Sequence, residues 1–196
     1  MAYTQEEIGS IVKAQRKFFR SGMTLDVNWR IVQLIKLKHS VMKHKDMLIK
    51  ALGDDLGKSP LESYLCDIGP IITEVNEIIS NLRKWARPEK HFSGIMCFPS
   101  TRTTVYKLPY GVSLIISPFN FPILLTLGVL AASIAGGNTA VLKTSSKSAE
   151  STKALKKLIA DTFPENYITL ILNMLEVNED KRPDFIELEK KSKRKI

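Results

Sequence analysis

The chain has 196 residues, of which 44% are hydrophobic and 25% are charged. This balance is typical of a globular protein with one substantial core, and it excludes disordered, collagen-like and fibrous chains. The two cysteines and three histidines lack the spacing of a disulfide framework or a zinc site, so no metal is expected. The reducing cytoplasm is the expected compartment.

The formal net charge is +9, from 29 basic and 20 acidic residues. Five positive charges stand together in residues 190–195, without aromatic side chains between them. Such a run is typical of a solvated tail, and nucleic-acid binding is not expected. Residues 108–142 carry no charge, but prolines and the pair Gly136-Gly137 interrupt them, so no membrane span is predicted.

The first two predicted elements are helices. Thr4 and Glu7 have the spacing of a capping box that begins a helix, and Ser21-Gly22 ends it. A second helix is predicted from about Val27 to Leu52. Its apolar side is expected to contain Trp29, Val32, Ile35, Val41, Leu48 and Leu52.

A third helix begins at the sequence Ser59-Pro60-Leu61-Glu62, which combines an N-cap serine, a first-turn proline and a glutamate. Gly69-Pro70 should kink or divide it, and Arg87-Pro88 should end it. Its apolar stripe is predicted to contain Leu61, Tyr64, Leu65, Ile68, Ile72, Val75, Ile79, Leu82 and Trp85. Cys66 is expected to be buried in this helix, Cys97 to be inert in an apolar connector, and the histidines to lie at the surface.

The pattern then changes to strands that alternate with helices. Thr101 to Leu108 is typical of an exposed strand. Buried strands are predicted at Val112 to Ser117 and Thr139 to Leu142, with a third at Tyr167 to Leu172. Between them lie a helix at Ile123 to Ala135, apolar nearly all round and capped by Gly136-Gly137, and an amphipathic helix at Ser148 to Phe163 with Leu155, Leu158 and Ile159 inward.

This order predicts an α/β fold: a helical leader followed by an incomplete, Rossmann-like parallel βαβ sheet. Three units are expected: a leader at 1–100, a partial dinucleotide-binding unit at 101–171, and an unrelated helical basic tail at 172–196. An open sheet of so few strands leaves an unpaired edge, which predicts association with another chain as a homo- or hetero-oligomer.

Two motifs carry a family resemblance. Residues 117–122 read Ser-Pro-Phe-Asn-Phe-Pro, and residues 135–143 read Ala-Gly-Gly-Asn-Thr-Ala-Val-Leu-Lys. Together they resemble the first βαβ unit of the aldehyde dehydrogenases. Residues 16–24 and 54–59 of the leader are similar to the class 3 subgroup. The resemblance covers about residues 5–170.

The resemblance assigns a catalytic role to Asn120. In the family, the asparagine of this motif donates a hydrogen bond to the oxyanion that forms when a cysteine thiolate attacks an aldehyde. Phe119 replaces the family's tryptophan, which keeps an apolar ring and removes an indole donor.

The resemblance also implies a nucleotide site. Lys143 matches the lysine that contacts the adenosine ribose, and Ser146 stands where the family usually has a glutamate that holds both ribose hydroxyls. Because serine removes a charge that would repel a 2′-phosphate, NADP is expected to be tolerated as well as NAD. Ile116 and Ser117 are expected to line the cofactor cleft through their backbone, and Thr144 replaces the family's proline.

Three parts of the family's chemistry have no counterpart in this sequence. These are the Gly-Ser-Thr-x-x-Gly turn near the pyrophosphate, the glutamate general base and the cysteine nucleophile. Neither Cys66 nor Cys97 has a matching context. Residues 172–188 instead resemble the end of a protein-kinase C-lobe, with Met-Leu, an acidic loop and Arg-Pro-x-Phe. Kinase activity is excluded because the kinase catalytic motifs are absent.

The sequence therefore predicts an aldehyde dehydrogenase family member, with NAD(P)-dependent oxidation of an aldehyde to a carboxylate as the family activity. The chain is expected to be truncated and inactive alone. The alternative is a non-catalytic remnant that associates with a full-length homologue.

Overall fold

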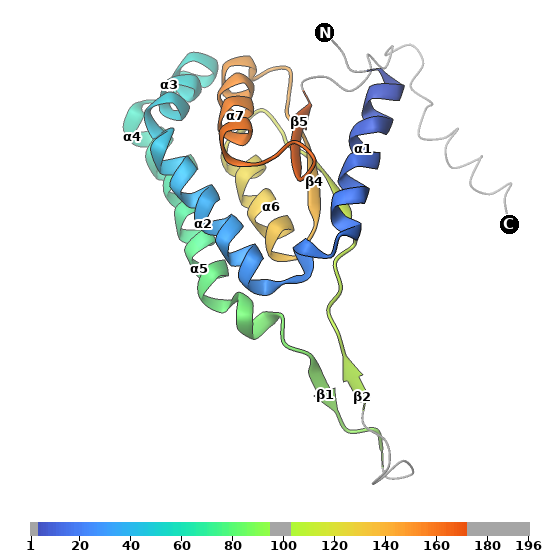
Figure 1. Ribbon diagram of the computed structural model, residues 1–196. Coiled ribbons are helices and arrows are strands. Elements are labelled where there is room, and N and C mark those ends of the chain that lie inside the picture. The colour runs from blue at the N-terminus through green and yellow to red at the C-terminus, as the bar shows by residue number, and fades with distance from the viewer. Residues whose placement is uncertain (1–3, 95–102, 172–196) are drawn as a thin grey trace, which may run out of the picture.

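The computed structural model describes residues 4–94 and 103–171. A three-stranded sheet lies between α1 on one face and α6 and α7 on the other. The leader helices α2 and α5 form a further layer on the side of α6 that faces away from the sheet (Figure 1). This is the predicted combination of a helical leader and a parallel sheet, so the predicted fold class is confirmed.

The leader consists of helices joined by short turns. In chain order these are α1 (Gln5–Arg20), the 3-10 turn η1 (Met23–Leu25), α2 (Val27–Lys43), α3 (Lys45–Leu56), α4 (Pro60–Ser63), the π-helical turn η2 (Tyr64–Ile68) and α5 (Gly69–Trp85). The predicted caps are present: Thr4 and Glu7 form the capping box, and the Ser59 hydroxyl accepts from the Glu62 amide.

The prediction of one continuous helix from Val27 to Leu52 is wrong, because the chain bends at His44. This imidazole is buried rather than at the surface, and its ring nitrogens lie 2.9 Å from the Ser40 carbonyl and 3.0 Å from the Asp161 carboxylate on α7. The bend turns α3 onto α7. The apolar side also differs from the prediction. Val32 and Ile35 are exposed, while the buried positions include Ile31, Leu34, Leu37, Val41, Leu48 and Leu52.

The Gly69-Pro70 break takes the form of a π-helical turn. The Gly69 amide reaches back five residues to the Tyr64 carbonyl, which accommodates a proline without an amide hydrogen. This turn moves the polar Asp67 inward and leaves Cys66 outside. The predicted burial of Cys66 is therefore wrong. The first part of the predicted stripe is exposed as well, at Leu61, Tyr64 and Leu65, as is Trp85 at its end. Cys97 lies outside the described residues.

The three central strands are β3 (Val112–Ile116), β4 (Thr139–Lys143) and β5 (Ile168–Ile171), in the order β3-β4-β5 and all parallel. Strands β4 and β5 are almost wholly buried, whereas only Ile115 of β3 is buried. The predicted burial of β3 is correct only in part, since Leu114 and Ile116 are more than half exposed.

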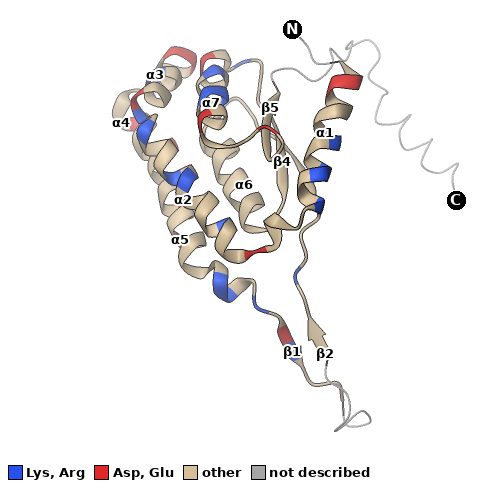
Figure 2. Ribbon diagram, in the orientation of Figure 1, with Lys and Arg blue, Asp and Glu red and all other residues tan. Residues whose placement is uncertain are grey.

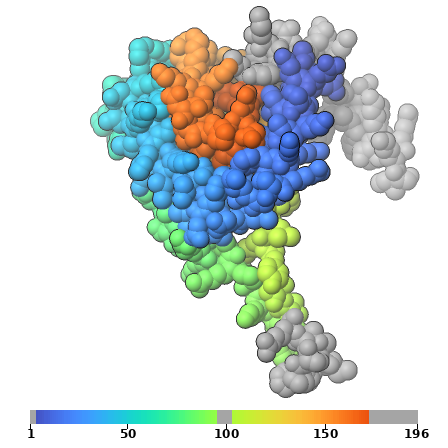
Figure 3. Space-filling view, in the orientation of Figure 1, coloured from blue at the N-terminus to red at the C-terminus, as the bar shows by residue number. Residues whose placement is uncertain are grey.

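A second, two-stranded sheet leads away from the body. It pairs β1 (Glu89–His91), which the sequence pattern did not predict, with β2 (Thr103–Val105), which lies within the predicted exposed strand. The two strands form a narrow projection from the rest of the molecule (Figure 3).

The core is continuous from the leader to the sheet. Helix α6 (Leu124–Ala135) packs against β3 and β4 on one side and against α2 and α5 on the other. Its nearly uniform hydrophobicity follows from these neighbours. Helix α7 (Ala149–Thr162) buries Leu155, Leu158 and Ile159 as predicted. Figure 2 shows that α6, β4 and β5 carry no charged residues apart from the end of β4.

Tyr167 occupies the aromatic part of this core. It is 1% exposed, and its ring packs against Phe18, Trp29 and Phe163 at centroid distances of 4.9–5.6 Å. Its hydroxyl has no hydrogen-bond partner in the described chain, and burial raises its pKa, which keeps it protonated. An unpaired buried hydroxyl costs about 1–3 kcal/mol.

We therefore expect Tyr167→Phe to leave the free energy of unfolding unchanged or to raise it by up to about 2 kcal/mol. Urea denaturation followed by circular dichroism measures the difference. Tyr110→Phe is the control, because Tyr110 is fully exposed and its hydroxyl is hydrated in either state. A clear loss of stability in Tyr167→Phe alone would show that the hydroxyl has a partner.

In the described part of the chain, no helix combines the length and hydrophobicity needed to cross a membrane. The same residues contain no group of three or more potential metal ligands from His, Cys, Asp and Glu. The division into leader, dinucleotide-binding unit and tail stays a prediction, and the kinase-like segment at 172–188 lies outside the described residues.

Candidate functional site

The carboxyl ends of β3 and β4 bring three of the predicted nucleotide-site residues together. Ile116 and Lys143 are register partners on the two strands, and the Ser117 amide donates to the Lys143 carbonyl at 3.0 Å. Ser146 follows in the turn before α7 and is exposed. In parallel sheets of this kind, ligands bind outside the carboxyl ends of the strands.

The side chains of these residues differ in their availability. Ser117 is buried, and its hydroxyl lies 2.7 Å from Thr126 Oγ1 on α6, so that side chain is engaged within the fold. Ile116 is 65% exposed. Lys143 is half-buried, and no carboxylate of the described residues lies within ion-pair distance of its ammonium. The edge thus presents one apolar side chain, one ammonium without an acidic partner and one neutral hydroxyl.

Asn120 lies in the loop between β3 and α6, held between Pro118 and Pro122. Its side chain is exposed and makes no hydrogen bond with any described residue. The aromatic neighbours on either side each meet a lysine: Lys147 Nζ lies 5.3 Å from the Phe119 ring centre, and Lys58 Nζ lies 4.0 Å from that of Phe121. The Asn120 amide is therefore free to donate to a ligand.

Two aspartates from the leader occupy the helix starts at this edge. Asp67 Oδ1 lies 3.4 Å from the Leu124 amide at the start of α6. Asp55 accepts from the Glu150 and Ser151 amides of α7 at 3.1 and 2.6 Å. A helix start is a favourable place for a phosphate, but a carboxylate already satisfies these amides. Neither helix start is thus available to a pyrophosphate.

Sequence reasoning missed Lys58, Asp67, Asp55 and Thr126 as members of this neighbourhood. Lys58 and Asp55 belong to the leader segment that resembles the class 3 subgroup, but nothing in that segment shows what they contact. The one available signal for Lys58 and Asp67 was that two opposite charges stand nine residues apart, one before and one after the predicted helix start at Ser59.

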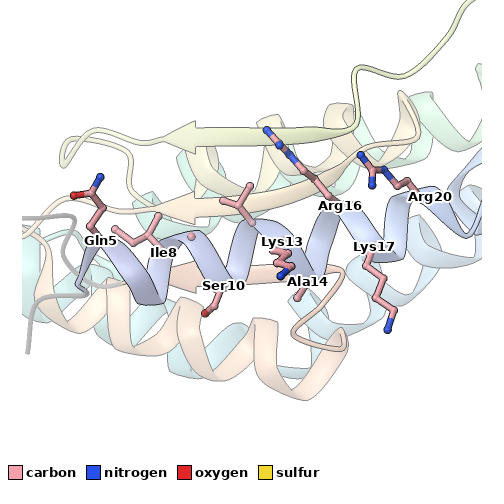
Figure 4. A pocket seen from close by; sticks show the side chains of 10 residues that line it. Gln5, Ile8, Ser10, Lys13, Ala14, Arg16, Lys17 and Arg20 are labelled. Atoms are coloured by element: carbon pink, nitrogen blue, oxygen red, sulfur yellow. The ribbon is translucent and has the colours of Figure 1, made fainter.

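A hollow on the described surface lies elsewhere. It is a groove of about 1030 Å³ beside α1, and all its described lining residues belong to that helix. Figure 4 shows Lys13, Arg16, Lys17 and Arg20 along it. Among the described residues, none from the carboxyl ends of the strands lines this groove, which therefore differs from the predicted nucleotide site.

Three parallel strands with helices on both faces define a protein of the α/β class with a Rossmann-like sheet. The family model described as "Aldehyde dehydrogenase family" matches residues 1–180. The chain therefore belongs to the aldehyde dehydrogenase family, which confirms the resemblance.

Relatives named as family 3 members support the class 3 assignment. The chain is 40% identical over 149 residues to aldehyde dehydrogenase family 3 comG of Dictyostelium discoideum, which covers 76% of this chain and 32% of the relative. It is 34% identical over 161 residues to 4,4'-diaponeurosporen-aldehyde dehydrogenase of Staphylococcus aureus, covering 82% and 35%. The chain thus spans about a third of the length of these relatives.

Solved structures show the same fold. The substrate-bound state of Staphylococcus aureus AldH matches with a TM-score of 0.82 and 34% identity, over 84% of this chain and 36% of that one. Betaine aldehyde dehydrogenase of the same organism, in complex with NAD⁺, matches with a TM-score of 0.76 and 26% identity, over 88% and 35%. Succinic semialdehyde dehydrogenase of Streptococcus pyogenes, in complex with NADP⁺, has a TM-score of 0.76 at 18% identity, over 87% and 37%.

Proposed function

We propose that this chain supplies the adenosine-binding and oxyanion-stabilising parts of an NAD(P)-dependent aldehyde dehydrogenase. The observation that carries the proposal is the pairing of Ile116 with Lys143 at the carboxyl edge, beside the loop that carries Asn120. A cytoplasmic location stays a prediction, as does the absence of nucleic-acid binding.

The edge residues fit the adenosine half of a dinucleotide. The Lys143 ammonium would donate to the ribose hydroxyls or to a 2′-phosphate. The neutral Ser146 would leave room for a ribose with or without a 2′-phosphate, because it carries no charge that repels the phosphate. The exposed side chain of Ile116 would cover an apolar part of the nucleotide. Since Asp55 and Asp67 occupy both helix starts, a pyrophosphate would have to be held by other groups. When bound, the nicotinamide would accept the hydride from the substrate.

Asn120 would act on the aldehyde oxygen. Its free amide can donate a hydrogen bond, and a fixed donor stabilises an oxygen most strongly once that oxygen becomes negative. The sequence contains no segment that matches the family's cysteine nucleophile or its glutamate base. We therefore propose that this chain alone does not oxidise aldehydes.

The nucleotide contacts can be tested by titrating the full chain with NADP and with NAD in a calorimeter. We expect NADP to bind, and Lys143→Met to weaken that binding by about 10-fold or more, because a hydrogen bond to a charged group contributes about 1.5–3 kcal/mol. Ser146→Glu should weaken NADP more than NAD, because a carboxylate repels the 2′-phosphate.

Lys153→Met is the matched control for Lys143→Met. Lys153 lies on the exposed side of α7, where its ammonium is paired with Glu150 at 2.6 Å. This substitution should leave NADP binding unchanged. Equal effects of the two lysine substitutions, or no binding of either nucleotide to the unsubstituted chain, would refute the proposed nucleotide site.

The alternative is a non-catalytic chain that associates with a full-length family member. The uncovered side of β3 favours it, because Leu114 and Ile116 are exposed on a strand with one free edge. The titration separates the two candidates, since an association partner needs no nucleotide contact at Lys143.

A further inference from the structure

The loop that carries Asn120 rests on a buried ion pair from the leader. Lys58 Nζ and Asp67 Oδ2 are 2.7 Å apart, and their side chains are only 10% and 0% exposed. Lys58 lies in the turn between α3 and α4, and Asp67 lies in η2. Both residues are therefore separated from the loop by at least 50 positions of sequence and meet it only in the folded chain.

Both members of the pair contact the segment around Asn120. The Lys58 ammonium lies 4.0 Å from the centre of the Phe121 ring, one residue beyond Asn120. The second oxygen of Asp67 lies 3.4 Å from the amide of Leu124, where α6 begins. The pair thus supports the loop at the residue after Asn120 and again at the start of the next helix.

Stability alone is a weak explanation for such a pair. Removing two charges from water costs about as much as their attraction returns, and a well-packed apolar pair of similar volume is often as stable or more so. A cation over an aromatic ring and a carboxylate at a helix start do, however, fix the direction of the groups they contact. The clearest gain from this pair is the geometry of residues 121–124.

We propose that Lys58 and Asp67 are positioning residues for Asn120. They hold Phe121 and the start of α6 in place, and through these contacts they limit the motion of the Asn120 side chain. This inference rests on the proposed function, in which Asn120 is the oxyanion donor. It adds that the leader, and not the βαβ unit alone, determines where that donor points.

The test measures the order of Asn120 by NMR in the ¹⁵N-labelled full chain. The side-chain amide signals of Asn120 are those that disappear in Asn120→Asp. The main variant combines Lys58→Met with Asp67→Leu, so that no unpaired charge remains buried. We expect the unfolding midpoint to change little, while the order parameter of the Asn120 side-chain amide falls below its value in the unsubstituted chain.

The matched control combines Lys50→Met with Asp54→Leu. These residues form an exposed ion pair four residues apart on α3, of the same charge types, and neither forms a hydrogen bond or ion pair with a described residue of the loop. The control should leave the Asn120 signals and their order parameters as they are in the unsubstituted chain. A general effect of removing a leader ion pair would instead appear in both double variants.

A second variant, Phe121→Leu, keeps the ion pair and removes the ring. This substitution should lower the order parameter of the Asn120 side chain without disturbing η2. It also tests the positioning role if the double variant fails to fold. The proposal is overturned if Asn120 stays as ordered as in the unsubstituted chain in either folded variant. Because this measurement needs no nucleotide, a chain that fails to bind NADP but shows loosening at Asn120 would refute the nucleotide site and support the positioning role.

Discussion

Replacing Gly137 by alanine should lower the free energy of unfolding by about 2–4 kcal/mol. Gly137 follows α6 with a φ of 82°, a backbone conformation that residues other than glycine rarely adopt. An added Cβ would also lie 2.7 Å from the Arg30 guanidinium. That group is 7% exposed and donates to the carbonyls of Thr24, Leu25 and Ala135. The new methyl group would force the guanidinium away from these acceptors.

Gly9→Ala provides a control of opposite sign. Gly9 lies in the middle of α1, and no atom lies within 4 Å of its added Cβ. Alanine is the better helix former, so this substitution should raise stability by about 0.5–1 kcal/mol. Urea denaturation of both variants gives the comparison. Losses of equal size at the two positions would contradict the role assigned to φ and to Arg30.

Replacing Leu127 by alanine should cost about 2.7–5 kcal/mol, because the change leaves a cavity between the sheet and the leader. Leu127 is fully buried on α6, the helix that contacts both layers. A protein of this size has a total stability of about 5–15 kcal/mol, so the variant should be close to the limit of folding.

Val129→Ala on the same helix distinguishes burial from hydrophobicity. Val129 is 48% exposed, and its truncation should change stability by no more than about 0.5 kcal/mol. Thermal unfolding followed by circular dichroism compares the two variants. A loss at Val129 as large as that at Leu127 would show that this side of α6 is covered in solution.

The parts of the fold that depend on local signals could be predicted from the sequence. The Thr4–Glu7 capping box, the Ser59 cap and the Gly137 helix end each need only a few neighbouring residues, and all three are present. The alternation of strands and helices after Gly111 can also be recognised from short stretches of sequence, and it predicted the parallel sheet.

The features that depend on distant partners could not be predicted. The bend at His44 reflects its contact with Asp161, 117 residues away. The exposure of Cys66 follows from a π-helical turn that redirects Asp67, a deviation that a 3.6-residue period does not contain. Strand β1 forms only because β2 lies beside it.

The candidate site divides in the same way. Family resemblance predicted roles for Asn120 and Lys143, since their motifs are continuous in sequence, and these roles stay predictions. The leader residues that contact the loop come from a different part of the chain, and no pattern in the sequence connects them to it.

The occupation of both helix starts by Asp55 and Asp67 has a consequence for protein engineering. If the βαβ segment were transferred to another protein without residues 50–70, backbone amides at the starts of α6 and α7 would lose their hydrogen-bond acceptors. Those amides would then attract whichever anion was most abundant in the buffer. A minimal βαβ fragment cut from this chain should therefore retain the stretch that supplies the two carboxylates.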